Sequence, residues 1–527
     1  MTSRISPLPA DRSQIMAALA RINEVDLIVI GGGATGLGIA VDASARGLSV
    51  VLLESHDFAK GTSSRATKLV HGGVRYLAQG NIALVREALH ERTTLLRNAP
   101  HLASPLGFVM PSYKCWETPF YGIGLKAYDA LAGQDGLGST RFLGRRQALA
   151  ALPGVKENGL KGGVMYWDGQ FDDARLALAL ARTAAANSAL VVNYCPVVDL
   201  LYDNQQVAGV ICEDAETEER YTIHSRCVIN ATGVWVDDLR RTDAQHTQQP
   251  VQSLVSPSQG VHLVVDREFL PSEHALLVPK TADGRVLFAV PWLGKVILGT
   301  TDTPRHDLAR EPAAFEEEIT FILSEAANYL AKAPTRADVR SVWVGLRPLV
   351  KADSVGSTKQ LSREHTILSS SSGLVTVTGG KWTTYRAMAE DVLKHCTQQG
   401  VLGHLAPSTT KSLVLVGAPV DRQNRSLQSQ PDARVYGSEA AWVQSLDGAD
   451  QEILPGLSQA MVRFAVRYEY ARTVEDVLAR RSRWLFLDAR QSAQAAPHVA
   501  EILEQEGIET PRLAEFLALC NQYQLHE

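Results

Sequence analysis

The amino-acid sequence predicts an α/β fold, with a parallel sheet near the start of the chain and an antiparallel sheet further along. The first observation is a βαβ pattern in residues 25–54, where an apolar strand, a glycine-rich turn, a helix and a second strand follow one another. The second is a set of short apolar segments between Asp-Gly and Leu-Gly turns in residues 251–350, a pattern typical of antiparallel strands. The chain has 527 residues, of which 45% are hydrophobic and 21% charged, as expected for a globular protein of two or three domains.

The βαβ pattern contains the parts of a dinucleotide-binding site. Gly31, Gly33 and Gly36 have G-x-G-x-x-G spacing. In this motif the first glycine permits a tight turn, the second lets a pyrophosphate approach the backbone, and the third lets the helix pack close to the strand. The helix of residues 34–46 directs its N-terminal amides and the positive end of its dipole at the pyrophosphate. Glu54 follows the second strand, where an acid accepts hydrogen bonds from an adenosine ribose.

The loop that follows, residues 56–80, is rich in Gly, Ser and Thr and is too irregular for a single helix or strand. We expect it to wrap around the cofactor, because it directly follows the acid. Its hydroxyl and ammonium groups could contact phosphates or the edge of a ring system, and its paired glycines would let the backbone approach a flat ring. The residues concerned are Ser63, Ser64, Lys68, Gly72 and Gly73. The alternative is a polar surface loop with solvated charges.

A second place where the backbone can come close to a ligand is predicted at the sequence NATG, residues 230–233, which follows a predicted strand at 221–229. A helix at 174–186, with Asp172 as its N-cap, and further strands precede this segment. Together with the βαβ unit, the segment resembles the flavoproteins of the glutathione-reductase superfamily, in which the first glycine motif binds the ADP half of FAD. A second G-x-G-x-x-G is absent from the sequence. We therefore expect the flavin to exchange electrons without a bound nicotinamide.

The antiparallel segment, residues 251–350, would form the substrate domain. Within it, residues 315–330 predict an amphipathic helix whose strongly acidic face should lie in water. Arg347 stands just before a proline at the end of the predicted strand 342–349. An arginine fixed there offers a fork of hydrogen-bond donors to a phosphate or a carboxylate.

Composition argues against several kinds of site. A formal net charge of −5 and a pI near 6.3 provide no basic field for nucleic acid. The six cysteines never occur as C-x-x-C, so we expect neither a metal site nor a redox dithiol, and a reduced cytoplasmic compartment. Residues 1–24 lack a signal-peptide core and no stretch approaches about eighteen apolar residues, so we expect a terminal helix packed on the body of the protein and no membrane span.

Several motifs then occur in the order found in one family. They are SSRATKLVHGGVRYL (63–77), FDDARL (171–176), NATGVW (230–235), GVHLVV (260–265), GTTD (299–302), GLRPL (345–349) and TGGKWTTYR (378–386). In combination they resemble the FAD-dependent glycerol-3-phosphate dehydrogenases of aerobic metabolism. The resemblance implies oxidation of sn-glycerol 3-phosphate to dihydroxyacetone phosphate, with FAD held non-covalently and electrons passed to membrane quinone. It also implies a C-terminal helical cap domain, in agreement with the helical pattern of residues 463–481.

The motifs and the resemblance together assign site residues and domains. Residues expected at the substrate are Arg75, Tyr76, His262, Arg347, Arg363, Lys381 and Thr384, with His262, Arg75 and Lys381 as the catalytic candidates. Residues expected at FAD are Gly31, Gly33, Gly36, Glu54, Ser63, Ser64, Lys68, Leu69, His71, Gly72, Val198, Ala231, Thr232, Gly233, Gly380, Thr383 and Thr384. The expected domains are an N-terminal extension (1–24), an FAD-binding domain (25–110, 160–245 and 355–400), a substrate domain (111–159 and 246–354) and a C-terminal helical domain (401–527).

The expected reaction needs a base. Oxidation of a secondary alcohol takes a hydride from carbon and a proton from oxygen, so a base must face the hydroxyl group. His262 is the first candidate, because its ordinary pKa of about 6.5 is close to neutral, whereas the pKa of Lys381 would have to fall far from about 10.4. The alternative for His262 is a histidine held by a strand neighbour, which polarises the hydroxyl group or only packs.

Residues 112–131 carry several aromatic side chains, with Lys114 and Lys126 among them. Such a stretch can rest on a bilayer interface, and burial between domains is the alternative. We expect peripheral attachment to the inner face of the cell membrane. We also expect quinone to be preferred to oxygen as acceptor, because the inserted segment of the related oxidases is not seen between GTTD and GLRPL.

Two other functions stay open. An amine or amino-acid oxidase of the same superfamily would use its arginine to bind a carboxylate. A flavoprotein that binds RNA or a protein partner would need a basic surface stripe, and the acidic pI is unfavourable for it. The oligomeric state is open, with a homodimer as one possibility.

Overall fold

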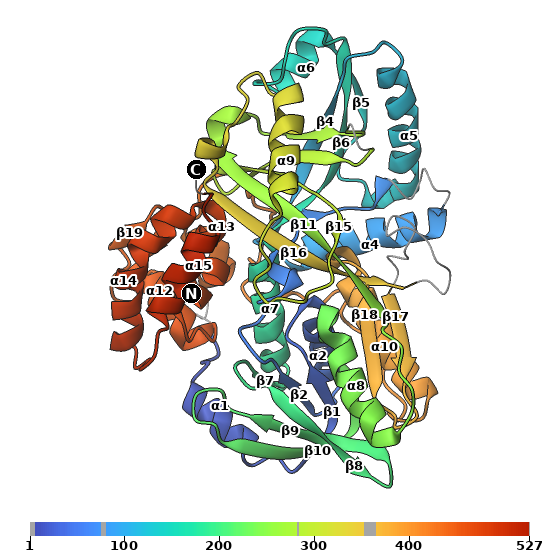
Figure 1. Cartoon of the computed structure of the whole chain (residues 1–527), viewed down its shortest axis with the longest axis vertical. Coiled ribbons are helices and arrows are strands. Elements are labelled where there is room, and N and C mark those ends of the chain that lie inside the picture. Colours follow the sequence, from blue (N-terminus) through green and yellow to red (C-terminus); the bar gives the residue numbers. More distant parts are fainter. Residues whose placement is uncertain (1–5, 75–80, 282–283, 352–364, 526–527) are drawn as a thin grey trace.

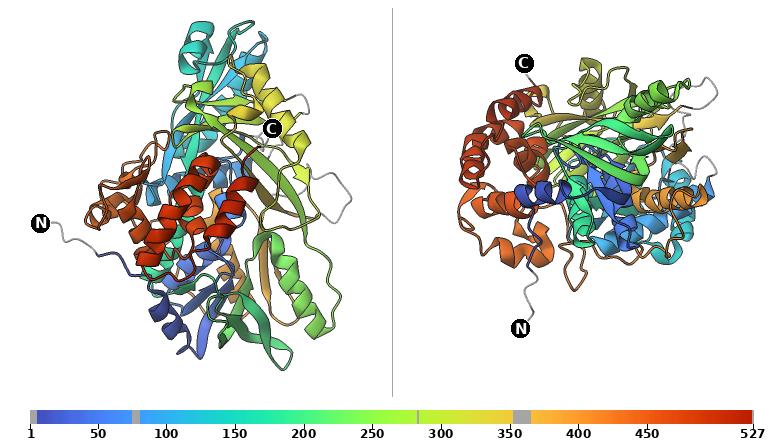
Figure 2. Two further views of the ribbon diagram at one scale, coloured as in Figure 1. Left: turned by 60° about the vertical axis from the view of Figure 1, so that its left-hand side comes forward. Right: turned by 90° about the horizontal axis from the view of Figure 1, so that it is seen from below.

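The computed structural model describes residues 6–74, 81–281, 284–351 and 365–525. Over these residues the chain forms two large sheets, with a cluster of C-terminal helices beside them. The first sheet lies in the lower half of Figure 1 and the second in the upper half, and the C-terminal helices, drawn in red, lie on the left. Figure 2 shows from two further sides that this cluster runs along one side of the molecule. The predicted α/β architecture is confirmed.

The first sheet contains the predicted βαβ unit. Its strands are β1 (Glu24–Ile30), β2 (Val50–Leu53), β7 (Leu190–Val192), β8 (Val197–Asp203), β9 (Gln206–Glu213), β10 (Arg220–Asn230), β17 (His365–Ser369) and β18 (Val375–Gly379). The main order is β17-β18-β10-β1-β2-β7, and β1 pairs in parallel with both neighbours. Residues 27–30 of β1 are all buried, as expected for a parallel strand covered on both faces.

Helices cover both faces of this sheet. They are α1 (Arg12–Leu19), α2 (Ala34–Ala45), α7 (Asp173–Ala186), α8 (Val236–Thr247) and α10 (Tyr385–Gln398). Leu27 and Val29 share a core with α2, α7 and α10, whereas the alternate residues Ile28 and Ile30 share one with α1. The predicted packing of the N-terminal helix on the body is confirmed. Asp172 caps α7 as predicted, because its side chain accepts a hydrogen bond from the Arg175 amide at 3.2 Å.

The second sheet is mainly antiparallel. Its strands are β3 (Leu69–Val70), β4 (Ala103–Ser112), β5 (Arg141–Gly144), β6 (Gly162–Phe171), β11 (Val255–Asp266), β12 (Ala275–Val278), β13 (Leu287–Trp292), β14 (Lys295–Gly299), β15 (Thr303–Pro304) and β16 (Ser341–Val350). β11 lies between β14 and β16, antiparallel to both. Strand pairing places β4 and β6 in this sheet, although the predicted boundaries assign β6 and residues 103–110 of β4 to the FAD-binding domain. The two strands pair with each other along their whole length, although about fifty residues separate them in the chain. The sequence of either strand alone does not show this pairing.

Four helices pack around the second sheet. They are α4 (Ile82–Asn98), α5 (Glu117–Ala132), α6 (Arg145–Ala151) and α9 (Glu316–Tyr329). The expectation that the acidic face of α9 lies in water is wrong for Glu318 and Glu325, which are buried. The Glu318 carboxylate accepts hydrogen bonds from the hydroxyls of Thr301 (2.7 Å) and Thr303 (2.6 Å). This carboxylate therefore fixes the segment that follows β14.

The aromatic segment of residues 112–131 lies on α5 and just before it. Trp116 and Phe120 are 53% and 65% exposed, so the alternative of burial between domains is wrong for them. Tyr128 of α5 is buried in the hydrophobic core, where its hydroxyl donates to Asp168 of β6 at 3.0 Å. Within the described residues, no helix is long and apolar enough to span a membrane.

The C-terminal region is helical but more divided than its pattern predicts. It contains α11 (Ala440–Val443), α12 (Gln459–Tyr468), a π-helical turn at Asp476–Arg481, α13 (Trp484–Leu487), α14 (Ala489–Gln505), α15 (Leu513–Gln522) and the hairpin β19 (Glu452–Leu454) with β20 (Leu457–Ser458). The helical pattern of residues 463–481 is interrupted after Tyr468, where Tyr470 has φ of +59°. Residues 401–432 run over the body without a helix or strand.

Candidate active site

A cleft of about 340 Å³ opens at the carboxyl ends of β1, β2 and β10, which is where ligands bind in open α/β sheets. It is lined by the glycine turn, by the loop after β2, and by the segment after β10. The predicted cofactor residues that line it are Gly31, Gly33, Glu54, Ser63, Val198, Ala231, Thr232 and Gly233. Segments far apart in the sequence thus meet at one edge of the first sheet.

The glycines of the turn have different steric roles. Gly31 has φ of +112°, and a Cβ atom there would lie 2.6 Å from the Ala231 carbonyl oxygen. A Cβ atom at Gly36 would lie 1.9 Å from the Gly31 carbonyl oxygen, so this glycine lets the helix pack closely on the turn. At Gly33 a Cβ atom would approach only the Ser63 hydroxyl, at 3.1 Å. Gly33 therefore leaves space for a ligand, whereas Gly31 and Gly36 are required by the packing of the protein itself.

Glu54 and Ser63 shape the two sides of the same turn. The Glu54 carboxylate accepts hydrogen bonds from the backbone amides of Gly32 (2.6 Å) and His56 (2.9 Å). The Ser63 hydroxyl accepts one from the Ala34 amide at the start of α2 (2.9 Å). An oriented acid at one end and a helix N-terminus with open space at the other match the ribose and pyrophosphate of a dinucleotide. These residues fit the ADP half of FAD.

The structure gives Lys68, Leu69 and Gly72 roles other than contact with the cofactor through their side chains. The Lys68 ammonium group is fully buried and donates to Asp173 (2.7 Å) and to the Ser64 carbonyl (2.7 Å), and burial lowers its pKa to about 7 although Asp173 opposes the shift. Leu69 packs in the hydrophobic core. A Cβ atom at Gly72 would meet the Tyr128 hydroxyl at 2.3 Å, so this glycine is required by core packing.

The TGGKWTT segment meets the loop after β2, residues 55–74, which we call the cofactor loop. The Trp382 indole donates to the Ser63 carbonyl at 2.9 Å, and the Thr383 hydroxyl accepts from the His71 amide at 3.3 Å. The Thr384 hydroxyl donates to the carbonyl of the half-buried Lys381. Gly380 has φ of +72° and packs against Met388. The structure thus brings His71, Thr383 and Ser63 together, as the assignment to one cofactor site requires.

The Ser64 hydroxyl is buried in this loop and has no hydrogen-bond partner among the described residues. A bound cofactor could supply that partner.

Three predicted substrate residues, Arg75, Tyr76 and Arg363, lie outside the described residues.

The strands β11 and β16 present one face to the cofactor loop. Directly opposed residues of an antiparallel pair share a face, and the pairs concerned are Ser258 with Arg347, Gly260 with Gly345, and His262 with Trp343. Alternate residues of a strand also share a face, so all of these residues lie on the same one. A Cβ atom at Gly345 would meet the Arg65 carbonyl oxygen at 2.7 Å, which shows how closely the cofactor loop approaches this face.

Arg347 is half-buried and fixed by acceptors around it. Its guanidinium donates to the Thr301 carbonyl (3.0 Å), the Thr300 hydroxyl (3.2 Å) and the Asp302 carboxylate (3.2 Å). A Cβ atom at Gly260 would lie 2.2 Å from the guanidinium, so a glycine there makes room for it. The predicted fixed donor fork is therefore present at the end of β16.

His262 is buried, and its ring stacks on Trp343 with centroids 4.0 Å apart. Its Nε2 lies 2.9 Å from the Thr67 hydroxyl of the cofactor loop, and its Nδ1 has no hydrogen-bond partner in the part of the chain that the structure describes. Burial, and then the positive charges of Arg347 and Lys68, lower the pKa of His262 well below its ordinary value. The imidazole is therefore neutral at pH 7. A general base must be in this state, and a histidine that only packs in the core is compatible with it.

Several residues of this site were not assigned from the sequence. Thr67, Thr300, Thr301 and Asp302 surround His262 and Arg347, while Trp235 and Arg310 line the cleft. The GTTD motif was the signal available for three of them. Asp173, which holds Lys68, is the second acid of FDDARL.

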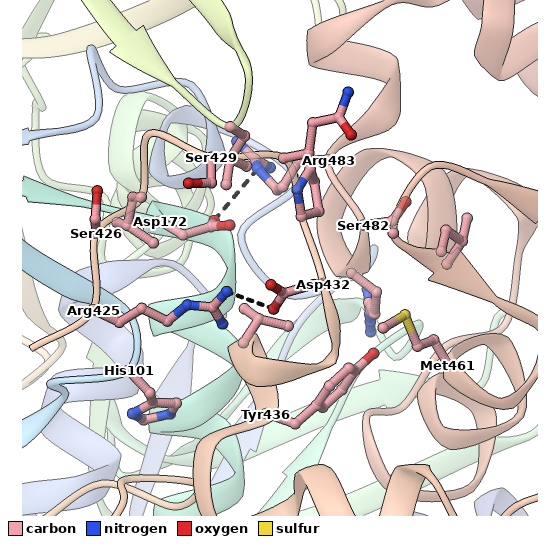
Figure 3. Close-up of a pocket in the computed structure, with 18 of the residues that line it drawn as sticks. His101, Asp172, Arg425, Ser426, Ser429, Asp432, Tyr436, Met461, Ser482 and Arg483 are labelled. Atoms are coloured by element: carbon pink, nitrogen blue, oxygen red, sulfur yellow. Dashed lines mark hydrogen bonds and ion pairs between the residues drawn. The ribbon is translucent and has the colours of Figure 1, made fainter. Parts of the chain in front are cut away.

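A smaller cavity lies between the C-terminal region and the body of the protein (Figure 3). Arg425 donates to Asp432 at 2.5 Å, and Arg483 pairs with Asp172 at 3.4 Å. Its volume of about 40 Å³ has room for a few water molecules. It is too small for FAD or for a sugar phosphate, so the active site is assigned to the cleft and to the face of β11 and β16.

Comparison with known proteins identifies the family. Residues 26–386 match the model of the FAD-dependent oxidoreductases, and residues 408–507 match the C-terminal domain of alpha-glycerophosphate oxidase. The mitochondrial glycerol-3-phosphate dehydrogenase of Bos taurus is 40% identical over 94% of this chain and 72% of its own length. The chain belongs to the FAD-dependent glycerol-3-phosphate dehydrogenases. The family, the fold class and the cofactor FAD inferred from the motifs are thereby confirmed.

Solved structures extend the comparison. The FAD complex of the glycerol-3-phosphate dehydrogenase of Bacillus halodurans is 30% identical, covers 97% of both chains and superposes with a TM-score of 0.76. Glycine oxidase from Geobacillus kaustophilus superposes with a TM-score of 0.52 over 74% of this chain and 98% of its own, at 20% identity. That second likeness shows the fold alone. The fold that this glycerol-3-phosphate dehydrogenase family member shares with glycine oxidase thus covers about three quarters of its chain.

Proposed function

We propose that this protein oxidises sn-glycerol 3-phosphate to dihydroxyacetone phosphate and that its electrons pass to membrane quinone. The observation that supports this most is the pairing of β11 with β16, which places His262 and Arg347 on one face beside the cofactor loop. A neutral imidazole and a fixed guanidinium are the groups that removal of a hydroxyl proton and binding of a phosphate require.

Arg347 would bind the substrate phosphate. A phosphate offers several acceptor oxygens to a fork of N–H donors, and charge-assisted bonds of this kind contribute about 1.5–3 kcal/mol. The contacts of Arg347 with Thr300, Thr301 and Asp302 orient the fork before the substrate arrives. Arg75, Tyr76, Arg363, Lys381 and Thr384 stay predictions as further substrate residues.

His262 would take the proton from the substrate hydroxyl. Its low pKa keeps the ring neutral in the acid range, and the bond between Nε2 and Thr67 orients it. FAD, when bound, accepts the hydride. The alternative role is that His262 only polarises the hydroxyl group or packs on Trp343.

An anaerobic titration tests the reaction. Glycerol 3-phosphate added to the purified protein should bleach the flavin absorbance band with one equivalent per flavin. Glycine and sarcosine should leave the band unchanged, because they carry no phosphate for Arg347 to bind and no hydroxyl group to oxidise. Bleaching by glycine or sarcosine alone would support the amino-acid oxidase instead.

We further propose peripheral attachment to the inner face of the cell membrane through α5. Trp116, Phe120 and Ile123 are 53%, 65% and 69% exposed, and their i, i+4, i+7 spacing places them on one side of the helix. Lys114 and Lys126 are exposed next to them and could contact lipid head groups. This arrangement supports the quinone acceptor, because a lipid-soluble acceptor has to be met at the bilayer.

A further inference from the structure

Arg310 belongs to the part of the chain that forms the second sheet, which we call the second-sheet domain, but its side chain lines the cofactor cleft at the edge of the first sheet. Arg310 lies in the connection between β15 and α9, yet it lines the cleft together with Glu54 and Asp238. Its guanidinium carbon is 3.7 Å from the centroid of the Trp235 ring. Trp235 follows the NATG segment and closely approaches Gly61 of the cofactor loop, where a Cβ atom would lie 3.0 Å from the indole. Arg310 thus crosses from one domain to the cofactor site of the other.

Neighbouring ion pairs hold Arg310 in this place. The Glu311 carboxylate accepts from Arg65 (2.6 Å) and pairs with Lys60 (2.7 Å), and both of these cations belong to the cofactor loop. Arg65 also donates to the carbonyl oxygen of Arg310 at 3.1 Å. From the C-terminal region, the Tyr523 hydroxyl donates to Glu311 at 3.2 Å. The backbone at Arg310 is therefore fixed to the cofactor loop.

The charge of Arg310 is available to a ligand. Lys60 also lines the cleft, but its ammonium group is paired with Glu311 and Glu475. The Arg310 guanidinium stacks on Trp235. Among the described residues, it makes no hydrogen bond or ion pair. Desolvation lowers the pKa of Arg310, and the nearby carboxylates of Glu54 and Asp238 oppose the shift. Because the ordinary pKa of a guanidinium is so high, Arg310 still carries its charge at neutral pH after this shift.

We propose that Arg310 is a cofactor-binding residue, contributed by the second-sheet domain, whose guanidinium pairs with the pyrophosphate of FAD while stacking on Trp235. A pyrophosphate brings two negative charges into a cleft where Glu54 and Asp238 are already acidic, so a full positive charge there adds to the partial charge at the N-terminus of α2. Glu311, Arg65 and Lys60 are positioning residues for Arg310. The inference depends on FAD occupying the cleft and not on the identity of the substrate.

The test compares substitutions that keep or remove the charge. Arg310→Gln removes it, Arg310→Lys keeps it, and Arg220→Gln is the matched control, because Arg220 on β10 is exposed and pairs with Glu213 away from the cleft. FAD affinity is measured by fluorescence titration of the full-length apoprotein. Arg310→Gln should weaken FAD binding about ten- to a hundredfold, the range for loss of a charge-assisted hydrogen bond, and reduce its salt dependence. Arg310→Lys should recover part of the loss, and Arg220→Gln should change the affinity less than about twofold.

Two nucleotide probes locate the contact. Competition with ADP should weaken in Arg310→Gln, whereas competition with adenosine should stay unchanged, because adenosine has no phosphate. Equal losses for ADP and adenosine would overturn the proposal, since Arg310 would then act on the adenine or on the shape of the cleft. Unchanged FAD affinity in Arg310→Gln would overturn it as well.

A double substitution tests the positioning residues. Glu311→Gln alone should weaken ADP binding but not adenosine binding. Added to Arg310→Gln it should cause no further loss for ADP, because residues that act through one group are not additive. A full additional loss for ADP in the double variant would show that Glu311 acts on the cleft independently of Arg310.

Discussion

Arg347 is held by acceptors of its own protein before any substrate phosphate reaches it. We predict that Arg347→Ala raises the KM for glycerol 3-phosphate about ten- to a hundredfold, because charge-assisted hydrogen bonds to the phosphate are lost. Oxidation of glycerol, which has no phosphate, should change little. Steady-state kinetics with both substrates measure the difference.

Arg347→Lys is the matched variant for this prediction. It keeps the charge but not the planar fork, so its KM should lie between those of the protein and of Arg347→Ala. A parallel fall for glycerol and glycerol 3-phosphate would contradict the phosphate role. It would show instead that the contacts with Asp302 and Thr301 support the fold of the site.

His101 provides a pH-dependent stability test away from the site. Burial, and then the charges of Arg175 and Arg182, lower its pKa from 6.5 to about 3. Below pH 6.5 the unfolded chain binds a proton that the folded chain does not, so stability falls with falling pH by up to about 1.4 kcal/mol per pH unit. His101→Asn should therefore lose less thermal stability between pH 6.5 and pH 5 than the protein does.

The exposed His404 supplies the control for this measurement. His404→Asn should follow the protein over the same pH range, because an exposed side chain has similar surroundings in the folded and the unfolded chain. Parallel curves for the protein and His101→Asn would mean that His101 is protonated in the folded state.

At the residue scale, the sequence predicted the roles of site residues best where the spacing within one motif sets their geometry. Gly31 and Gly36 have the steric roles that the motif assigns, because both lie within one βαβ unit, and Glu54 of the same unit lines the cleft. Lys68 and Gly72 were assigned to the cofactor for their chemistry and position, yet their partners Asp173 and Tyr128 are far away in the sequence. No local pattern could have shown those contacts.

At the scale of an element, the turn between β1 and α2 separates ligand binding from folding. Gly33 has φ of −87° and ψ of −176°, values open to any residue, and its Cβ position faces the cleft. We predict that Gly33→Val folds but purifies without FAD, because the branched side chain occupies the space of the pyrophosphate. Flavin content and the thermal unfolding of the apoprotein measure the two effects separately.

Gly36→Val gives the contrasting result. Its Cβ would lie 1.9 Å from the Gly31 carbonyl oxygen, so the turn and the helix would have to separate, at a cost of about 3 kcal/mol or more. We expect this variant to be unstable with or without FAD. Full flavin occupancy in Gly33→Val would contradict the assignment of this turn.

The π-helical turn at Asp476–Arg481 shows what periodicity does not reveal. Arg480 and Arg481 both pair with the buried Asp57 of the cofactor loop, and Arg480 also pairs with Asp476 at 2.7 Å. The helical pattern predicted an element here, but not that its charged side chains would be buried. Their partners come from a loop more than four hundred residues earlier in the chain.

At the scale of the whole molecule, buried charges join the three parts of the chain at the cofactor loop. Lys68 and Arg483 share Asp173 of α7, while Glu311 links the loop to the second-sheet domain. The sequence predicted the classes of sheet and the helical end of the chain. It could not assign β4 and β6 to the second sheet, because partner choice between strands depends on the tertiary fold.

The exposed face of α5 leads to a prediction about the whole molecule. Trp116 and Phe120 lie on the outside of the protein together with Ile123, and Phe142 of β5, 48% exposed, packs against Gly122 beside them. Exposed apolar groups gathered in this way are typical of a surface that meets a membrane or a partner. If the surface meets a membrane, electrons can pass from the active site to a quinone that never leaves the bilayer.

We predict that replacing Trp116 and Phe120 with serine lowers binding to phospholipid vesicles by about tenfold or more, because two aromatic side chains no longer leave water. Flavin reduction by glycerol 3-phosphate should stay nearly unchanged, and reduction of a water-soluble quinone should persist while that of a long-chain quinone falls. Val420 and Leu517 are exposed elsewhere, so the same double change there provides the control and should leave vesicle binding intact. Equal loss in both double variants would mean that general hydrophobicity, and not α5, determines attachment. Stoichiometric peroxide without quinone reduction in the unmodified protein would identify oxygen as the acceptor and remove the reason for a membrane-facing surface.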